Sequence, residues 1–139
     1  MTQQAADIYG TAFKNGSLTL MARVLGYGGA PIHSADIAAA VYSIYFLDDD
    51  EADARTPVPG HQDVSLTPAA VVLDALATGP PWDATSDPAG YNFLHTLDVS
   101  QHPAFPVAGV NCLVEYCLTA GSGGEAGQPI LVRFRVNVI

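Results

Sequence analysis

Apolar and polar side chains alternate along several short stretches of the chain, a pattern typical of half-buried β-strands. The clearest pair is residues 111–119 (NCLVEYCLT) and 130–138 (ILVRFRVNV), in which every second residue is apolar over most of the stretch. The intervening GSGGEAGQP predicts the long loop of a β-hairpin. If these stretches pair as neighbouring strands with their apolar residues on the same side, Glu115 lies close to Arg133 or Arg135. This predicts a cross-strand ion pair on the outer face.

Other stretches alternate in the same way. They are residues 17–25 (SLTLMARVL) and 91–99 (YNFLHTLDV), and a further strand is predicted over residues 39–47 (AAVYSIYFL). The alanines before residue 41 permit a helix, but the β-branched and aromatic residues that follow favour a strand. Residues 64–67 predict a short extended segment, and residues 71–76 predict either a strand or one or two helical turns.

These short strands, with connections rich in glycine and proline, predict an all-β protein. Length favours one domain, because the chain has 139 residues. The predicted fold is a single immunoglobulin-like β-sandwich of about six to eight antiparallel strands over residues 17–139. Residues 1–16 mix small and polar residues with Ile8, Tyr9 and Phe13, and predict an N-terminal arm that is either flexible or docked on another subunit.

Cysteines and histidines lack the spacing of metal or redox motifs. Cys112 and Cys117 are five positions apart on one predicted strand, so they face opposite sides and should not form a disulfide. His95 lies in a strand pattern and is predicted to be a hydrogen-bonded histidine of the core or of a subunit contact. The other histidines, His33, His61 and His102, lie outside the strand patterns. Phosphate loops, HExxH, CxxC and nucleophile elbows are absent from the sequence, so we expect no catalytic residue, no cofactor and no enzyme activity.

Charge is scarce and mostly negative. The net charge is -9 with five Lys and Arg, which argues against a nucleic-acid partner. Charged residues make up 14% of the chain, against about 25% in an average soluble domain. An isolated small domain favours a well-charged surface, so we expect part of this surface to be covered by neighbouring subunits. No signal-peptide pattern opens the sequence and no apolar run has the length of a membrane helix; we expect a protein that is made in a cytoplasm and has no membrane contact.

The highest density of charge lies directly after the strand predicted over residues 39–47. The carboxylates of this acidic run are Asp48, Asp49, Asp50, Glu51 and Asp53. Calcium ligands of an EF-hand need a glycine turn and a glutamate at the twelfth position, and this run has neither. A solvated loop is therefore the leading interpretation. A calcium site that uses Asp48, Asp50, Glu51 and Asp53 is an alternative, and so is docking to a basic partner surface through Asp49.

The order of several segments resembles a known group of proteins. These segments are LTLMARVLGYGGAPI, VYSIYFLDDD, WDATSDPAGYNFLHTLD and CLVEYCLTAGSGGEAGQPILVRFRVNV. Their layout over residues 17–138 is similar to that of small immunoglobulin-like proteins of bacteriophage virions. The resemblance implies a structural role, as a capsid decoration, a head–tail connector or a tail component, in a particle assembled in the bacterial cytoplasm. It implies virion proteins or copies of the same chain as partners, and transfers no catalytic residue.

Two hypotheses follow for function. The first is a non-enzymatic assembly protein, with partner contacts at Ile8, Tyr9, Phe13, Tyr27, Asp49, Trp82 and Tyr91. The second is a carbohydrate- or ligand-binding β-sandwich module, in which Tyr27, Trp82 and Tyr91 provide exposed rings, with or without calcium at the acidic run.

Overall fold

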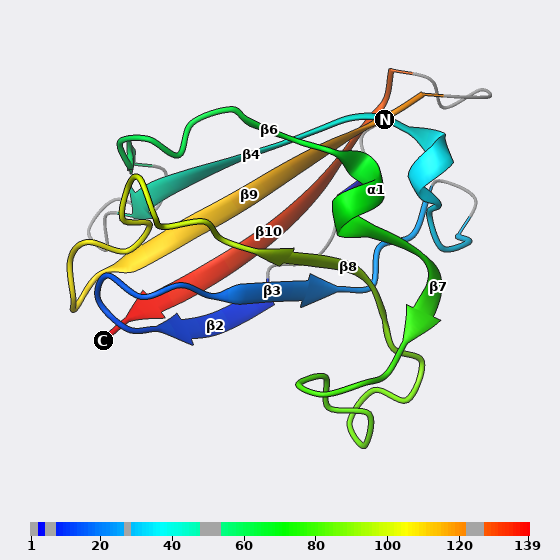
Figure 1. Cartoon of the computed structure of the whole chain (residues 1–139), viewed down its shortest axis with the longest axis horizontal. Coiled ribbons are helices and arrows are strands. Elements are labelled where there is room, and N and C mark those ends of the chain that lie inside the picture. The colour runs from blue at the N-terminus through cyan, green and yellow to red at the C-terminus, as the bar shows by residue number, and fades with distance from the viewer. Residues whose placement is uncertain (1–2, 5–7, 27–28, 48–53, 122–126) are drawn as a thin grey trace.

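The chain folds into two β-sheets packed face to face (Figure 1). The computed structural model describes residues 3–4, 8–26, 29–47, 54–121 and 127–139. The larger sheet contains β1 (Gln3–Gln4), β2 (Ile8–Ala12), β4 (Ile37–Leu47), β5 (Arg55–Pro57), β6 (Val64–Leu66), β9 (Asn111–Ala120) and β10 (Pro129–Val138). The smaller sheet contains β3 (Thr19–Ala22), β7 (Val72–Ala77) and β8 (Tyr91–Thr96).

The strand order is that of an immunoglobulin-like sandwich. In the larger sheet β10, β9 and β4 are antiparallel neighbours, with β5 and β6 on the far side of β4. In the smaller sheet the order is β3-β8-β7. These orders reproduce the G-F-C-C′ and B-E-D arrangements of immunoglobulin domains. The predicted all-β sandwich is therefore confirmed.

The N-terminal segment corrects two details of that prediction. Strand β2 pairs with β10 in parallel, from Ile8 opposite Phe134 to Ala12 opposite Val138, and β1 also pairs with β10 in parallel. The sandwich is therefore not purely antiparallel. Ala12 is buried and Ile8 packs against the core, so residues 8–12 are a strand of the domain. The prediction that the domain begins at residue 17, after an arm, is therefore wrong for residues 8–12.

Alternation correctly identifies the buried faces of the hairpin β9–β10. The residues predicted to face inward are all buried, namely Cys112, Val114, Tyr116 and Leu118 of β9, and Ile130, Val132, Phe134, Val136 and Val138 of β10. Leu113, on the opposite face of β9, is buried as well. On the outer face Arg133 Nε lies 3.0 Å from Glu115 Oε2, which confirms the predicted ion pair. Cys112 and Cys117 are both free thiols. Burial raises the pKa of Cys112 to about 11, so this thiol stays protonated at neutral pH.

Residues 71–76 are strand from Val72 onwards, which confirms the strand alternative, and a helical turn precedes them. A single helical turn, α1 (Pro68–Val71), begins with proline at its first position, where the missing N–H costs nothing. Strand β7 follows directly at Val72. A short 3₁₀ helix, η1 (Ser34–Asp36), leads into β4, which starts at Ile37 rather than at residue 39. Among the described residues, no helix has the length and apolar character needed to cross a membrane.

Asn92 of β8 is a polar residue that is buried, although in an alternating strand it lies on the face opposite Phe93. Its side chain is 1% exposed. The amide bonds the backbone of Val24 in both directions, because Val24 N donates to Asn92 Oδ1 at 2.7 Å and Asn92 Nδ2 donates to Val24 O at 2.9 Å. These bonds extend the pairing of the smaller sheet beyond the end of β3 at Ala22, so a side chain replaces part of the backbone ladder.

Candidate interaction site

Two tyrosine–histidine pairs lie in the core of the sandwich. Tyr42 OH lies 2.8 Å from His61 Nδ1, and Tyr116 OH lies 2.7 Å from His95 Nδ1. The Tyr42 and Tyr116 rings are neighbours, with centroids 5.7 Å apart, so the pairs form one cluster. His95 is thus hydrogen-bonded, as predicted, and it is half-buried at the margin of the core. His61 is 2% exposed, although the sequence places it in a loop.

The hydrogen bonds of His61 define its tautomer when it is neutral. Its Nε2 lies 2.8 Å from the carbonyl oxygen of His102, and a carbonyl oxygen only accepts. Nε2 therefore carries the hydrogen, and Tyr42 donates its hydroxyl hydrogen to Nδ1. The loop that contains His61 is thereby tied both to β4 and to the loop that precedes β9.

Burial favours the neutral forms of three members of the cluster, Tyr42, Tyr116 and His95. It raises the pKa of Tyr116 and lowers the pKa of His95. It also raises the pKa of Tyr42, with a smaller contribution from the negative charge of Asp98. In the described part of the chain every buried side-chain nitrogen or oxygen has a hydrogen-bond partner. A satisfied network of phenols and imidazoles holds the two sheets in one arrangement.

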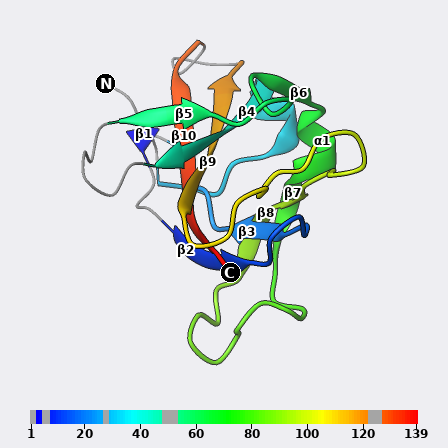
Figure 2. The ribbon, with the colours of Figure 1, turned by 90° about the vertical axis from the view of Figure 1, so that its left-hand side faces the viewer.

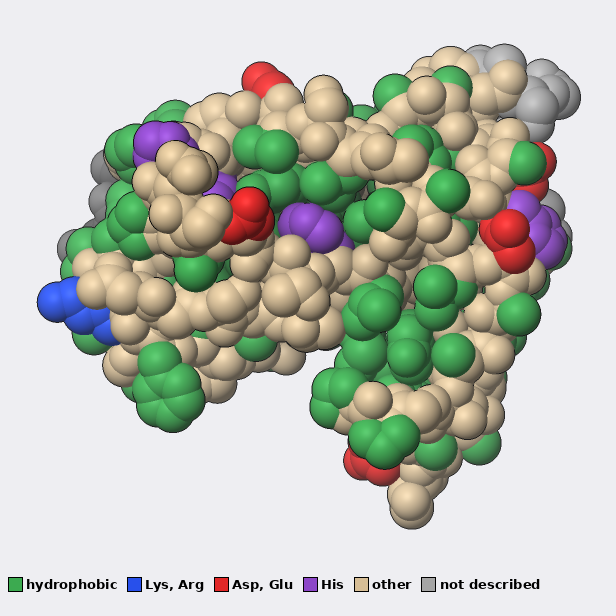
Figure 3. Space-filling view, viewed as in Figure 1, with side chains coloured by type: hydrophobic (Ala, Val, Ile, Leu, Met, Phe, Trp, Pro, Cys, Tyr) green, Lys and Arg blue, Asp and Glu red, His purple; other side chains and the backbone are tan. Residues whose placement is uncertain are grey.

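An apolar groove opens where the edges of the two sheets meet. Strand β2 lies at the edge of the larger sheet and β3 at the edge of the smaller one, and both views place them side by side (Figures 1 and 2). The groove between them has a volume of about 200 Å³. Its apolar lining is formed by Ile8, Tyr9, Leu18, Leu20, Met21, Pro81, Trp82 and Phe134. In Figure 3 the molecule is notched between the body of the sandwich and the projecting connection from β7 to β8.

Backbone edges border this groove. Neither β2 nor β3 pairs with a described strand on its outer side. Such an edge presents backbone N–H and C=O groups to an incoming strand. The site therefore combines an apolar surface with two strand edges, the two features used in binding by strand addition.

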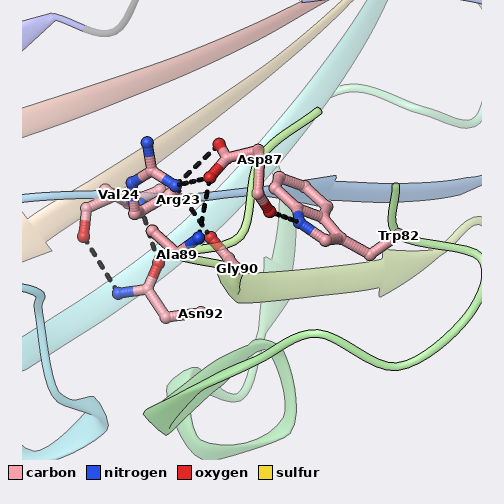
Figure 4. A network of polar contacts seen from close by, with 7 residues as sticks. All are labelled: Arg23, Val24, Trp82, Asp87, Ala89, Gly90 and Asn92. Atoms are coloured by element: carbon pink, nitrogen blue, oxygen red, sulfur yellow. Dashed lines mark hydrogen bonds and ion pairs between the residues drawn. The ribbon is translucent and has the colours of Figure 1, made fainter. Parts of the chain in front are cut away.

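An ion pair positions Trp82, which forms one wall of the groove (Figure 4). Arg23 Nη1 lies 2.6 Å from Asp87 Oδ1 and 2.7 Å from Asp87 Oδ2, and it also donates to Gly90 O at 3.2 Å. The backbone carbonyl of Asp87 accepts the indole N–H of Trp82 at 2.9 Å. The hydrogen bonds to Arg23 hold the pKa of Asp87 below its usual range. Arg23, just past the end of β3, thus fixes the connection that carries Trp82.

Tyr91 supports Trp82 from behind. The two ring centroids are 5.3 Å apart. Tyr91 is 9% exposed, so its ring packs under the indole and is not itself an accessible contact. The wall of the groove is therefore a pair of rings inclined at 42° to each other, of which Trp82 is the outer one.

The residues predicted to contact a partner lie in different parts of the structure. Ile8, Tyr9 and Trp82 come together at the groove, with Tyr91 behind them. Phe13 is 73% exposed but follows the other end of β2. Tyr27, Asp49 and the calcium candidates Asp48, Asp50, Glu51 and Asp53 lie outside the described residues. Within the described residues, no group of three or more His, Cys, Asp or Glu is placed to hold a metal ion.

Sequence patterns miss other parts of the groove. Leu18 and Met21 fall on opposite faces of the alternating stretch 17–25, and Phe134 falls on the inward face of β10, yet all three line the groove. A groove at the rim of a sandwich takes residues from both faces of its edge strands, and alternation alone does not reveal which strands are edges. Comparison of the chain with protein-family models, curated proteins and solved structures finds no match.

Proposed function

We propose that this protein is a non-enzymatic structural subunit of a phage or phage-like particle, as a capsid decoration, connector or tail component. It acts through contacts with copies of itself and with other virion proteins. The observation that carries the proposal is the apolar groove between the open edges of β2 and β3. The particle context is supported by the segment layout described for residues 17–138, and by that layout alone.

Surface composition supports a subunit that is covered in use. Tyr9 is 77% exposed at the groove, and it lies on an edge strand. Large aromatic residues are enriched at the centres of protein interfaces. With charged residues at 14% of the chain, few charges offset such apolar patches.

The occupant that fits the groove is an extended apolar segment of a neighbouring subunit. Main-chain hydrogen bonds to β2 or β3 would provide affinity, and alternate side chains of the segment would enter the space beside Trp82. The carbohydrate-binding alternative remains a prediction. It needs accessible rings, and of its three aromatics Tyr91 is buried and Tyr27 lies outside the described residues.

Light scattering over a range of concentrations tests the proposal. Met21→Glu places a charge in the groove on the outward side of β3, and should shift an associating protein towards monomer. Val107→Glu is the matched control, because Val107 is 46% exposed and does not line the groove. It should associate like the wild type. A wild-type chain that remains monomeric at high concentration, and that is absent by negative-stain microscopy and mass spectrometry from particles of the producing organism, would overturn the proposal.

A further inference from the structure

Strand β7 departs from the regular ladder of the smaller sheet. It is in register with β8 where Val72 lies opposite Phe93, and again where Ala77 lies opposite Tyr91. Between these two pairs, four residues of β7 face a single residue of β8. Such an irregularity is a large β-bulge, and bulges are over-represented beside active sites, where they redirect side chains. The bulge therefore marks this edge of the sheet as a place to look for a ligand.

A pocket of about 270 Å³ lies at this bulge. It is lined by residues 73–76 of β7, by Ala30, Pro31 and His33, and by Asn92, the residue of β8 opposite the bulge. Both polar ends of the Asn92 amide are bonded to the backbone of Val24, so this part of the lining is fixed. The rest of the lining is mostly apolar, and Asp74 is its carboxylate.

Asp74 places a negative charge at the mouth of the pocket. Its Oδ1 accepts the Ser34 N–H at 2.8 Å, and its Oδ2 accepts the Ser34 hydroxyl at 3.3 Å. These hydrogen bonds hold the pKa of Asp74 below its usual range, with a smaller contribution from His33. The Asp74 side chain is 65% exposed, and a carboxylate has about four acceptor sites, so a further donor can reach it. Among the described residues, no Lys or Arg lines the pocket.

We infer that this pocket binds a free aliphatic amine, whose alkyl chain lies against the apolar lining and whose ammonium group pairs with Asp74. An ammonium group donates three hydrogen bonds and accepts none, which suits a site whose charged group is a carboxylate. The net charge of -9 also favours a cation over an anion.

The shape of the site favours a compact free molecule. Pockets for drug-sized ligands have volumes of about 300–1,000 Å³, so this pocket of about 270 Å³ suits a smaller ligand. A bulged edge strand is a poor template for an added strand, which disfavours an extended segment of a partner at β7. The pocket shares no described lining residue with the groove between β2 and β3, so the inference does not rest on the proposed function.

Titration of the whole nitrogen-15-labelled protein with n-pentylamine tests the inference by NMR. The controls are n-pentanol, which has the same chain without the charge, and pentanoate, which has the opposite charge. At pH 8 and low salt we expect pentylamine to shift the amide signals of residues 73–76. It should bind about threefold to fivefold more tightly than pentanol, the effect of an exposed ion pair, and pentanoate should bind most weakly. Pentylamine that leaves these signals unshifted, or binds no more tightly than pentanol, overturns the inference.

Variants test the counter-ion and the lining separately. Asp74→Asn removes the charge but keeps an oxygen that can accept the Ser34 N–H, so it should fold and bind pentylamine no more tightly than pentanol. Asp98→Asn neutralises an exposed carboxylate outside the pocket and should behave like the wild type. If Asp74→Asn still prefers the amine, Asp74 is not the counter-ion and the inference is overturned.

A change of volume locates the ligand. Ala75→Leu adds bulk to the lining and should weaken the binding of both pentylamine and pentanol. Ala84→Leu makes the same change at an exposed position outside the pocket and should weaken neither. Unchanged binding in Ala75→Leu would place the ligand elsewhere and overturn the pocket as the site.

A lysine peptide distinguishes a free amine from a protein side chain with the same ammonium group. The tripeptide acetyl-Ala-Lys-Ala-amide should bind more weakly than pentylamine. Tighter binding of the tripeptide overturns the free amine as the occupant and assigns the pocket to a lysine of a partner protein. Met21→Glu, the groove variant, should bind pentylamine like the wild type whether or not the groove has a partner, which keeps this result separate from the proposed function.

Discussion

The hydroxyl of Tyr116 lies 2.7 Å from Nδ1 of His95, and this bond joins the two sheets of the sandwich. Tyr116 is on β9 in the larger sheet and His95 is on β8 in the smaller one. Phe93, also on β8, meets the same tyrosine ring edge to face at 4.7 Å between centroids. One phenol therefore provides both a polar and an aromatic contact between layers, and the state of His95 matters for the stability of the fold.

Acid should destabilise the protein partly through His95. Burial lowers the pKa of His95 in the folded state below its usual value of 6.5. As the pH falls below 6.5, the unfolded chain takes up a proton that the folded chain still excludes, so the free energy of unfolding decreases until the pH passes the folded pKa. Urea denaturation at pH 7.5 and pH 5.5 measures this loss. His95→Gln should lower stability at pH 7.5 but lose less than the wild type on going to pH 5.5.

His33→Gln is the control for this comparison, because it removes an imidazole from an exposed position. Its pH profile should follow that of the wild type. If His95→Gln loses as much stability between the two pH values as the wild type does, the titration belongs to other groups and the role given to His95 is wrong.

Two glycines with similar backbone angles should differ sharply when replaced by alanine. Gly60 has φ of +84° and Gly109 has φ of +83°. A Cβ at Gly60 would lie 2.2 Å from Cγ of His102, whereas a Cβ at Gly109 has nothing within 4 Å. Gly109→Ala should cost about 1–2 kcal/mol from the left-handed backbone alone. Gly60→Ala should cost clearly more, because it displaces the loop whose carbonyl binds His61. Urea denaturation of both variants measures the difference, and equal losses would contradict the close packing.

Alternation of apolar residues was sufficient to predict the sandwich and its buried faces. In β9 and β10 every predicted inward residue is buried, because these central strands are covered on one side by the smaller sheet. The ion pair of Glu115 and Arg133 followed from the same register. Central strands are predictable in this way because burial and alternation have the same period.

Contacts made by loops and edges could not be read in the same way. His61 lies next to Gly60 in a segment with no periodic pattern, yet tertiary bonds to Tyr42 and His102 bury it. Strand β2 contains only one fully buried side chain, Ala12, so its apolar pattern was too weak to distinguish a parallel edge strand from an arm. The ion pair of Arg23 and Asp87 spans 64 positions, and no local spacing signals it.

The ion pair of Arg23 and Asp87 should control the environment of Trp82 more than the stability of the fold. The two side chains are 33% and 35% exposed, and exposed ion pairs contribute little to stability. Arg23→Gln should therefore shift the urea midpoint only slightly. The protein has one tryptophan, so fluorescence reports on Trp82 directly. We expect a red shift of emission and stronger acrylamide quenching in this variant. Arg55→Gln, on the other sheet, should leave both signals unchanged; a red shift of similar size there would contradict the local role of Arg23.

Neutralising part of the acidic run should leave folding intact. Because the run is interpreted as solvated and lacks the ligand spacing of an EF-hand, Asp49→Asn with Asp50→Asn removes only mutual repulsion and exposed charge. The thermal midpoint of the double variant should match that of the wild type within about 2 °C, a shift that corresponds to less than about 1 kcal/mol in a domain of this size. Added calcium should move neither midpoint. A large loss of stability in the double variant, together with stabilisation of the wild type by calcium, would instead establish a bound ion at this run.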